Sequence, residues 1–574
     1  MRCSGSSFRA TCCAAIPESE ATLPDSTDRT MSVATALRAA AEVVGDRPAV
    51  IQGDRSVGYA ELDARSSRLA GVLAERGVGP GSTVAISLYN SFAYLEIMYA
   101  VFKLGAQPVN INYRYLAPEL HYVLDYTDAA AFVYDSSLAA QVQQIDGDLP
   151  KLGLFLEAGS ATEPPAPAVS FAWAAEHGPV HEAVDTGSPH GIILLTGGTT
   201  GRPKGVVWDR DGLLGIIASV FRQHGLPAPE TPDDVRARVR ELHERGLAPT
   251  VLPMSPLIHG TGLLQTLRSL YGGGTICFCT SKSLNADEVW RTVQQHAVTD
   301  MVIVGDAFGR PLVDSLAAAE SSGKPYDISS LRTMTSSGVI WSADVKRRLL
   351  RHGNDLTLID NISASEGGPF GMAVARSEAD LADGRFTLAP VARVLDENDQ
   401  DIKPGTGQIG ILASAGPQPV GYLKDPERTA RVWRVVDGVR YSVPGDLASL
   451  DADGKLILLG RGDGVINTGG EKVFPEEVEE ALLTHPKVTD AVVVGVPDPR
   501  WGQIVVAVVA PASALADIED ETLSRLVAER LAGYKRPRRV VRVDSLHRSP
   551  AGKINRASAR EVATRHLQAE ETAS

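Results

Sequence analysis

The sequence predicts an α/β protein with several subdomains, and three observations support this. From about Met31 onward, short apolar runs alternate with amphipathic helical stretches, the pattern of a mainly parallel sheet covered on both faces. Between Phe386 and Leu459 the apolar period shortens toward two and turns such as Asp453-Gly454 appear, which predicts a β-rich subdomain. After Gly460 a new series of helices and strands begins. At 574 residues the chain is too long for a single hydrophobic core.

Alternating elements dominate the N-terminal part. Apolar periodicity there predicts helices and strands in turn, namely helices over residues 34–41, 59–76 and 93–104 and strands over residues 48–52, 83–88 and 192–195. Two stretches break the alternation. Residues 157–190 are rich in Ala, Pro and Glu and predict a surface loop. Residues 225–246 carry three prolines and a charged helix, and they predict a solvated surface insertion.

The last part of the chain predicts a compact α+β unit. It is expected to contain helices over residues 475–483 and 520–532 and strands over residues 488–496 and 504–509. A unit of roughly 110 residues is a normal size for one domain. The predicted domains are therefore residues 31–460 and residues 461–574. Residues 1–30 are expected to be a disordered extension, or to precede a true start at Met31.

Composition and charge exclude several classes of protein. Apolar residues make up 44% and charged residues 22% of the chain, and the formal net charge of -14 argues against nonspecific binding of nucleic acid. The longest apolar run, residues 504–510, is far too short to span a membrane. The first 30 residues lack the apolar segment of a secretory signal, so a transit peptide is the targeting alternative to a disordered tail. Five cysteines form neither a disulfide framework nor a zinc spacing, which favours a reducing cytoplasm.

A glycine-rich stretch, Gly191 to Trp208, is the strongest functional feature. Its glycines let backbone N–H groups approach phosphate oxygens, its threonines add hydroxyl donors, and Lys204 adds a positive charge. The stretch therefore predicts a phosphate-binding loop. The Walker P-loop does not fit, because Lys204 is followed by Gly205 and Pro203 removes a backbone donor. The alternative is a flexible glycine turn that binds no ligand.

The run T-G-G-T-T-G-x-P-K-G resembles the phosphate-binding signature of the adenylate-forming superfamily, which comprises acyl-CoA synthetases, luciferases and the adenylation domains of peptide synthetases. The resemblance extends over about residues 31–560. It implies a large N-terminal domain of two αβ sheet subdomains plus a β-rich subdomain, followed by a small mobile α+β domain. It also implies that Lys204 is catalytic, that Thr196 contributes to metal binding, and that ATP is bound by Thr196, Gly197, Gly198, Thr199, Thr200 and Gly201.

A downstream stretch resembles the metal-binding segment of the same superfamily. Residues 356–360 predict a strand, and the following Asn361-Ile-Ser-Ala-Ser-Glu-Gly-Gly predicts a loop. By resemblance, Glu366 is catalytic and holds Mg²⁺ against ATP, Ser365 contacts a phosphate, and Asp360 contacts the adenine amine. Ile362 stands where relatives have a tyrosine that stacks on adenine, so it can cover the base only by dispersion. Without this context, Glu366 would be an ordinary surface glutamate.

Two further stretches complete the nucleotide site that the resemblance implies. Gly338, within Ser336-Ser-Gly-Val-Ile, would let the backbone approach adenine, although Ser-Ser-Gly alone is only a turn. Asp446 and Arg461 match the run W/Y-x-x-x-G-D, D-G and G-R. A carboxylate can accept hydrogen bonds from both ribose hydroxyls, and a guanidinium can bind ribose or phosphate. The alternative for this pair is a salt bridge at a β-turn.

The C-terminal motifs concern the second half of the reaction that the resemblance implies. Asp463 aligns with the hinge about which relatives rotate the C-terminal domain. Gly469, Gly470 and Lys472 lie in the motif that approaches the thiol donor, with a structural β-turn as the alternative. Lys553, in Arg548-Ser-Pro-Ala-Gly-Lys, resembles the catalytic lysine that also binds ATP, and it would stabilise charge that develops on the α-phosphate.

The acid-binding pocket is expected to begin at His259 and Gly260, after Pro253-Met-Ser-Pro-Leu-Ile. Peptide-synthetase domains place an aspartate near this position to hold an ammonium group. Because desolvating an ammonium without a carboxylate is costly, an α-amino acid substrate is disfavoured. The alternative for His259 is a packed aromatic residue with no contact to the acid. Several details look most like actinobacterial fatty-acid and sterol-side-chain CoA ligases, which suggests a bulky lipid acid.

The resemblance implies a two-step reaction with ATP, Mg²⁺ and coenzyme A as cofactors. A carboxylate attacks the α-phosphate of ATP to form an acyl-adenylate and pyrophosphate, and the thiol of coenzyme A then displaces AMP. The expected partner is a small carboxylic acid, and no nucleic acid is expected to bind. No membrane-spanning segment is expected. A homodimer is an open possibility. Two alternatives stay open: a ligase that loads a carrier protein, and a non-enzymatic nucleotide-binding relative.

Overall fold

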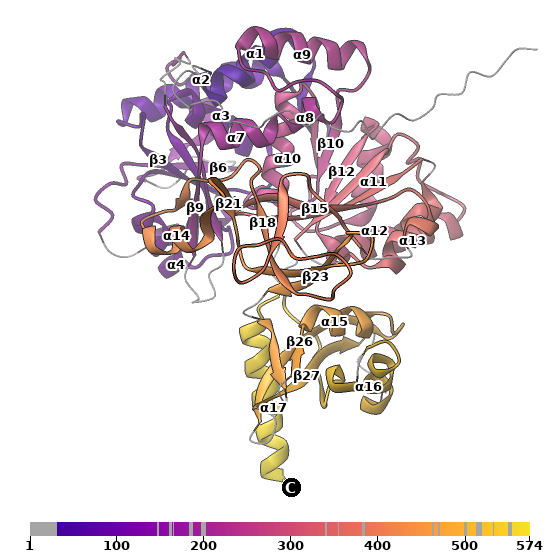
Figure 1. Ribbon diagram of the computed structural model, residues 1–574. Coiled ribbons are helices and arrows are strands. Elements are labelled where there is room, and N and C mark those ends of the chain that lie inside the picture. Colours follow the sequence, from indigo (N-terminus) through magenta and orange to yellow (C-terminus); the bar gives the residue numbers. More distant parts are fainter. Residues whose placement is uncertain are drawn as a thin grey trace, which may run out of the picture.

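The strands that the structure describes form four sheets, three in a large N-terminal body and one in a smaller C-terminal body (Figure 1). The computed structural model describes residues 31–145, 148–159, 164, 166–182, 188–196, 203–338, 341–353, 355–381, 385–461, 464–468, 471–498, 502–511, 519–531, 533–548 and 554–573. The predicted α/β class, with a large multi-sheet domain and a small α+β domain, is confirmed.

The first large sheet has eight strands in the order β19-β9-β8-β4-β3-β5-β6-β7. The run from β8 to β7 is parallel, and β9 and β19 extend it in the antiparallel sense. Its elements are β3 (Thr83–Ser87), β4 (Gln107–Asn110), β5 (Ala129–Asp135), β6 (Leu154–Ala158), β7 (Val169–Ser170), β8 (His190–Thr196), β9 (Lys204–Asp209), β19 (Gly421–Tyr422) and the helices α2 (Tyr59–Glu75), α3 (Phe92–Lys103), α4 (Ala117–Tyr126), α5 (Ala139–Gln143) and α6 (Phe171–His177).

The second large sheet has nine strands in the order β16-β15-β14-β13-β12-β10-β11-β1-β2, with a parallel centre and antiparallel edges. Its strands are β1 (Pro48–Gln52), β2 (Arg55–Gly58), β10 (Thr250–Pro253), β11 (Thr275–Phe278), β12 (Asp300–Ile303), β13 (Thr333–Ser337), β14 (Thr357–Ala364), β15 (Gly367–Ala375) and β16 (Thr387–Leu388). The helices that belong to this part are α1 (Val33–Val44), α8 (Ser219–Arg222), α9 (Pro232–Glu244), α10 (Gly260–Tyr271), α11 (Ala286–His296), α12 (Gly305–Ser321) and α13 (Ala343–His352), whereas α7 (Arg210–Ile217) packs against β8 and β9 of the first sheet.

An apolar core joins the two large sheets. It contains Ile86 of β3, Leu213 of α7, Leu263 of α10 and Ile276 of β11, all buried. Helices that pack between the two sheets therefore hold the sheets in a fixed relative position. Their side chains contact both sheets, and in a close-packed core one sheet cannot shift without disturbing these contacts. This matters for function, since the carboxyl ends of parallel strands are where α/β sheets bind ligands.

The predicted β-rich subdomain is a six-stranded sheet that includes the order β20-β21-β18-β22-β23, with β17 paired to β18. All of its pairings are antiparallel. Its elements are β17 (Ala392–Leu395), β18 (Gly410–Ser414), β20 (Trp433–Val436), β21 (Val439–Ser442), β22 (Asp446–Leu450), β23 (Leu456–Arg461) and the helix α14 (Pro426–Val432).

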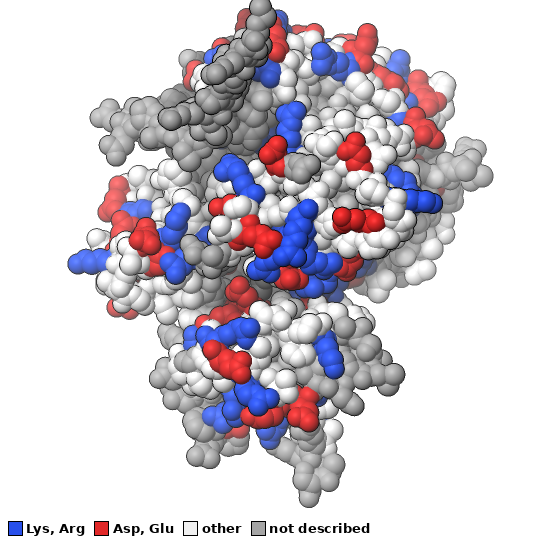
Figure 2. Space-filling view, turned by 90° about the vertical axis from the view of Figure 1, so that its right-hand side faces the viewer, with Lys and Arg blue, Asp and Glu red and all other residues white. Residues whose placement is uncertain are grey.

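The C-terminal body is a five-stranded sheet with helices packed on it, and it lies below the six-stranded sheet in Figure 1. Figure 2 shows the surface narrowing where the two bodies meet. The elements of the C-terminal body are β24 (Ile466–Thr468), β25 (Glu471–Val473), β26 (Val488–Asp498), β27 (Gly502–Pro511), β28 (Arg539–Arg542) and the helices α15 (Pro475–Leu483), α16 (Asp520–Ala528) and α17 (Arg556–Ala573).

Some expected elements differ from the structure. The surface loop expected over residues 157–190 is wrong, because it contains the end of β6, the strand β7 and the helix α6, whose Phe171 and Ala174 are buried. The stretch 225–246 does contain the expected helix, but α9 is not simply solvated. Its apolar face, Val235, Val239 and Leu242, is buried, and its Arg236 pairs with Glu42 of α1 at 2.7 Å.

Two boundaries were also misjudged. The strand β14 does not stop at Asp360 but continues to Ala364, because its residues pair with the antiparallel strand β15. The predicted loop there is thus a tight turn at Ser365 and Glu366. The helix α16 ends at Ala528 rather than Ala532. The other predicted helices and strands of the N-terminal and C-terminal parts are present within one or two residues, except that α1 ends three residues after the predicted end at Ala41.

Candidate functional site

One large cleft, with a volume of 2860 Å³, opens where the carboxyl ends of both large sheets face each other. Asn110 at the end of β4 and Thr196 at the end of β8 come from one sheet, and Ser255, Val304 and Ser337 lie at or just after strands of the other. The cleft therefore occupies the position where parallel α/β sheets bind ligands. It brings together these residues singled out from the sequence: Thr196, Gly338, Asp360, Ser365, Glu366, Asp446, His259 and Gly260.

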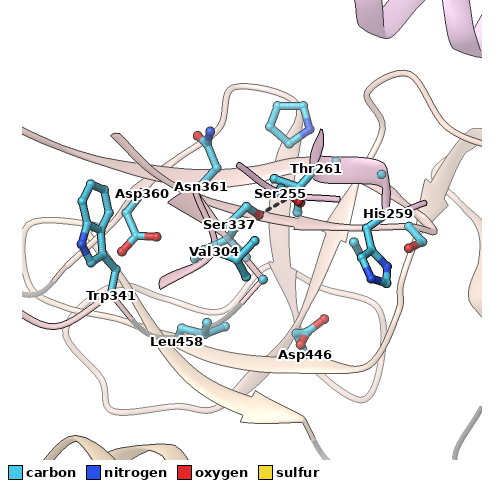
Figure 3. A pocket seen from close by; sticks show the side chains of 18 of the residues that line it. Ser255, His259, Thr261, Val304, Ser337, Trp341, Asp360, Asn361, Asp446 and Leu458 are labelled. Atoms are coloured by element: carbon cyan, nitrogen blue, oxygen red, sulfur yellow. Dashed lines mark hydrogen bonds between the residues drawn. The ribbon is translucent and has the colours of Figure 1, made fainter. Parts of the chain in front are cut away.

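The labelled side chains in Figure 3 give the cleft two ends. Trp341 and Asp360 lie at one end, and His259 lies at the other, near Thr261. Asp446 lies opposite the strand that carries Asn361, with the cleft between them. Groups that are hundreds of residues apart in the chain thus face one common space.

The Glu366 turn is held by side chains from the other two N-terminal sheets. The Trp208 indole of β9 donates to the Ser365 carbonyl oxygen at 3.2 Å. The Glu366 carbonyl oxygen accepts two hydrogen bonds, from the Trp433 indole at 3.2 Å and from the Ser442 hydroxyl at 2.6 Å. These donors are buried, so the bonds are protected from water. All three N-terminal sheets therefore meet at this turn and fix its backbone.

The Glu366 carboxylate points into this shared space from a largely buried position, with 8% of the residue exposed. Its Oε1 accepts a hydrogen bond from the Tyr422 hydroxyl at 2.8 Å, and its Oε2 has no partner in the described part of the chain. The residue after Glu366, Gly367, must be a glycine for two reasons. It has a φ of 142°, and a Cβ there would lie 2.9 Å from the Ser442 side chain.

The wall near Gly338 is built from the end of β13. Gly338 has a φ of 94°, and open space surrounds the position that a Cβ would occupy. The neighbouring Ser337 and Ser363 hydroxyls share a hydrogen bond of 2.8 Å. One step back, the Ser336 hydroxyl accepts a bond from the Gly305 N–H at 2.9 Å. A ligand can therefore approach the backbone closely at Gly338, on a wall whose own polar groups are satisfied.

Asp360 forms an ion pair that the sequence did not suggest. The Lys346 ammonium of α13 lies 2.7 Å from the Asp360 carboxylate. Burial raises the pKa of the Asp360 carboxyl, and the Lys346 ammonium opposes this effect. The neighbouring Trp341 indole N–H is buried and has no hydrogen-bond partner among the described residues. This end of the cleft thus offers an acceptor and an unused donor side by side.

Lys204 lies directly across the strand pair from Thr196, because the two residues are register partners of β9 and β8. The Lys204 Nζ is buried and has no hydrogen-bond partner in the described part of the chain. A buried ammonium without a partner is costly, so an anionic ligand is the natural complement. The loop that joins the two strands, with Gly197, Gly198, Thr199, Thr200 and Gly201, lies outside the described residues.

Asp446 and Arg461 are also register partners, at the ends of β22 and β23. The structure thus brings their backbones together as the motif spacing implied. Beyond them, the Glu476 carboxylate of α15 lies against the Gly460 backbone, so that a Cβ at Gly460 would overlap it. Arg556 of α17 pairs with Glu476 at 2.7 Å, and these residues extend the cleft lining into the C-terminal body.

Several predicted residues cannot be placed. Asp463, Gly469, Gly470 and Lys553 lie outside the described residues, and only the backbones of Arg461 and Lys472 are described. Their roles stay predictions. Conversely, sequence reasoning missed the groups that hold the Glu366 turn: Trp208, Tyr422, Trp433 and Ser442. No local motif marks them, because each acts through a contact with a residue more than fifty positions away.

The described residues contain neither a metal site made of protein ligands alone nor a membrane-spanning helix. Among the described residues, no group of three or more His, Cys, Asp or Glu side chains could hold a metal ion by itself. Within the same residues, no helix is both long and apolar enough to cross a membrane. Cys277 and Cys279 are both free thiols. A metal at this cleft would therefore depend on a ligand for part of its coordination.

Comparison with known proteins agrees with this geometry. Residues 37–422 match the family model of AMP-binding enzymes, and residues 477–553 match the model of the C-terminal domain of AMP-binding enzymes. A 3-oxocholest-4-en-26-oate–CoA ligase of Rhodococcus rhodochrous is 37% identical over 532 residues, which cover 91% of this chain and 94% of the relative. A medium/long-chain-fatty-acid–CoA and 3-oxocholest-4-en-26-oate–CoA ligase of Mycolicibacterium smegmatis is 36% identical over 93% of this chain and 96% of its own.

A solved structure shares the fold. The crystal structure of an anthranilate CoA ligase in complex with anthranoyl-AMP superposes with a TM-score of 0.77 at 21% identity, covering 93% of this chain and 97% of the other. The chain belongs to the family of AMP-binding enzymes, within the adenylate-forming superfamily. The resemblance noted in the sequence is therefore confirmed.

Proposed function

We propose that this protein activates a lipid-like carboxylic acid, such as a medium- or long-chain fatty acid or a sterol side chain, as an acyl-adenylate, and then transfers the acyl group to coenzyme A. By homology the enzyme is an AMP-forming acid–CoA ligase. The observation that supports the finer proposal is the convergence of Thr196, Glu366 and Asp446 on one cleft. A reducing cytoplasm, expected from the cysteine pattern, remains part of the proposal.

The nucleotide is proposed to lie across the cleft. Adenine would pack beside Gly338, with its amine toward Asp360 and Ile362 covering the base, and Asp446 with Arg461 would hold the ribose. Thr196, Ser365 and the loop residues Gly197, Gly198, Thr199, Thr200 and Gly201 would bind the phosphates. Lys204 would place its buried charge on the same phosphates.

Glu366 fits the role of a magnesium ligand. Mg²⁺ is usually held by one or two carboxylates together with substrate phosphates, and it prefers oxygen ligands. The Glu366 Oε2 atom and the Thr196 hydroxyl both line the cleft and match this donor set. When bound, the metal would neutralise charge on the phosphates. The protein's part is to keep the Glu366 carboxylate in place, through the Tyr422 hydroxyl and the donors to the turn.

In the first step, the substrate carboxylate oxygen attacks the α-phosphorus, the bond to the bridging oxygen breaks, and pyrophosphate leaves. Lys553 is proposed to stabilise the charge that develops on the α-phosphate. In the second step the thiol sulfur attacks the acyl carbon and AMP leaves. Asp463 is proposed as the hinge between the steps, and Gly469, Gly470 and Lys472 as the approach for coenzyme A.

The acid is proposed to enter at His259 and Gly260. A Cβ at Gly260 would approach the Leu194 side chain at 3.3 Å, so the glycine keeps this entrance open. Leu257 and Ile258 are buried beside it, and no carboxylate occupies the corresponding segment. An ammonium group would find no partner here, which disfavours an α-amino acid.

Pyrophosphate release across a panel of acids, from acetate to sterol-derived acids, tests the proposal. We expect release with lipid-like acids and none with α-amino acids; release with amino acids alone would contradict the substrate class.

A mixing test identifies the acceptor of the acyl group, and thioester should form with coenzyme A. Thioester formation only with a carrier protein would instead favour the carrier-loading alternative. Lys553→Ala should abolish pyrophosphate release and leave the fold intact, whereas full release by that variant would refute the role of Lys553.

A further inference from the structure

Beyond His259, the lining of the cleft continues between two helical faces. Gly260, Thr261, Leu264, Gln265 and Arg268 of α10 all line it, at spacings that place them on one helical face. From α7 and α8, the lining residues are Gly212, Gly215, Ile216, Ser219 and Arg222. The helices α7, α8 and α10 pack against one another (Figure 1). We call the space between these faces the acyl channel.

The acyl channel mixes apolar side chains with the polar ones named above and is cationic at its far end. Leu264 and Ile216 lie between the entrance at Gly260 and two arginines, Arg222 and Arg268. Gly260 and Arg268 are eight positions apart on one helix, which corresponds to about 12 Å. A substrate that enters with its carboxylate near His259 would therefore bring its other end to the arginines.

Neither guanidinium has an ion-pair partner among the carboxylates of the described residues. Arg222 donates to the Gly215 carbonyl oxygen at 2.7 Å, and Arg268 donates to the side-chain oxygens of Gln265 and Gln223, the former at 3.0 Å. Asp300 is near enough to act on Arg268 electrostatically, but it accepts the Thr299 hydroxyl at 2.6 Å instead. Because a guanidinium has five N–H donors, both side chains keep donors in reserve.

Two positive charges lie close together here, and Asp300 supplies a nearby negative charge. Burial lowers the pKa of Arg222 and of Arg268, while the Asp300 carboxylate opposes the change at Arg268. The neighbouring His224 has its pKa lowered by burial first, and then by Arg268 and Arg245. Arg222 is exposed and Arg268 is half-buried, so an apolar terminus such as a methyl group would leave the more buried charge, that of Arg268, without a ligand partner.

We propose that Arg222 and Arg268 select acids that carry a second oxygen acceptor, a ketone or a carboxylate, at the end remote from the activated carboxyl group. This inference rests on the proposed function, because it assigns a substrate class to the same cleft. The shared chemistry is an sp² oxygen that accepts hydrogen bonds from guanidinium groups. A plain fatty acid of the same length is then a poorer substrate, since its methyl end displaces water from the arginines without replacing the hydrogen bonds.

Three matched acids test this: dodecanoate, the keto acid of the same length with its ketone next to the terminal carbon, and dodecanedioate. Each is assayed by acid-dependent pyrophosphate release with the wild-type enzyme and with Arg268→Met, Arg222→Met and Arg268→Lys. Arg245→Met is the matched control, because Arg245 is close by but pairs with Glu241 and does not line the cleft. Thermal unfolding of each variant shows whether it folds.

We expect the wild type to prefer at least one oxygen-ended acid by about tenfold or more in kcat/KM. Arg268→Met and Arg222→Met should reduce that preference and keep activity with dodecanoate, Arg268→Lys should retain part of it, and Arg245→Met should change nothing. The better of the two oxygen-ended acids distinguishes ketone from carboxylate recognition. Efficient use of dodecanoate with an unchanged ranking in all variants would overturn the inference but leave the proposed function standing. Failure to activate any acid of the whole panel would overturn both.

Discussion

The Glu366 turn and the far end of the acyl channel treat their polar groups in opposite ways. At the turn, the Glu366 carbonyl oxygen alone accepts two hydrogen bonds, and one carboxylate oxygen accepts a third. At the channel end, the hydrogen bonds of Arg222 and Arg268 go to neutral acceptors, and the nearby Asp300 carboxylate acts on Arg268 without bonding to it. The protein bonds the Glu366 turn from several sides, which fixes its position. The arginines at the channel end keep unused donors, as we propose for groups that bind a charged or polar ligand.

Lys204 and Lys103 show the same contrast between two buried ammonium groups. Lys103 is fully buried, yet it donates to the Asp63 carboxylate at 2.7 Å and to the Ser67 hydroxyl at 2.8 Å. Lys204 follows the glycine-rich stretch and has no hydrogen-bond partner among the described residues. The difference shows that burial alone does not identify a functional cation, and the lack of a partner makes Lys204 the better candidate of the two.

Replacing Glu366 should have the largest effect. Glu366→Gln keeps the backbone bonds of the turn but removes the negative charge, so the rate of pyrophosphate release should fall by about 100-fold or more. Glu182→Gln is the control, because Glu182 is exposed and its ion pair among the described residues is with Arg38 at the surface. If Glu366→Gln released pyrophosphate at the wild-type rate, the carboxylate would not be the metal ligand.

Lys204→Met should separate activity from stability. Removing an unpaired charge from a buried site should not lower the free energy of unfolding, while pyrophosphate release should fall by about tenfold or more, as expected for loss of a charge-assisted hydrogen bond. Lys103→Met is the contrasting variant, and it should lose about 3 kcal/mol of stability because Asp63 is left without its partner. Denaturant unfolding and the release assay measure both quantities. Equal losses of stability in the two variants would argue that the Lys204 ammonium is paired within the protein and is not available for an anionic ligand.

Trp433→Phe should have a moderate effect on the same turn. It keeps an aromatic ring but removes the indole N–H that donates to the Glu366 carbonyl oxygen, while Ser442 still donates. Loss of one hydrogen bond costs about 1 kcal/mol, so the rate should fall about fivefold. Trp173→Phe serves as the control, since Trp173 is 52% exposed on α6. An equal effect of both substitutions would mean that the turn is not positioned by Trp433.

The smallest effect concerns Asp360 and pH. Burial raises the pKa of Asp360, so the folded state holds this proton to a higher pH than the unfolded chain does. Its stabilising contribution is complete below the unfolded pKa and is lost as pH rises through the folded pKa. Asp360→Asn cannot titrate, so its free energy of unfolding relative to wild type should increase as the pH rises above the unfolded pKa of about 4. A relative stability that falls over this range would show that Lys346 dominates over burial.

Much of the fold was predictable because it follows local patterns. Apolar periodicity placed the helices and strands around Tyr59–Glu75 and His190–Thr196 within a residue or two. The misjudged places depend on distant partners. The strand β14 runs on to Ala364 because β15 pairs with it, and α9 is half-buried because its Val239 packs into the core that α1 shares.

The candidate site likewise contains residues that a local motif predicts and residues that only the structure reveals. Thr196, Glu366 and Asp446 were found because each stands in a short motif, and the structure brings all three to one cleft. Trp433, Ser442 and Lys346 could not be found in that way, because their importance lies in contacts with Glu366 and Asp360 that no spacing in the sequence encodes. Arg222 and Arg268 become notable only when their hydrogen-bond partners are known to be neutral groups.

The structure of the protein with a non-hydrolysable acyl-adenylate analogue bound is the most direct measurement. The account predicts adenine beside Gly338 and Asp360, ribose at Asp446, the phosphate mimic between Thr196 and Glu366, and the acyl chain running along α10 toward Arg268. An analogue bound outside this cleft, or bound inside it with the acyl chain directed away from α10, would contradict the account.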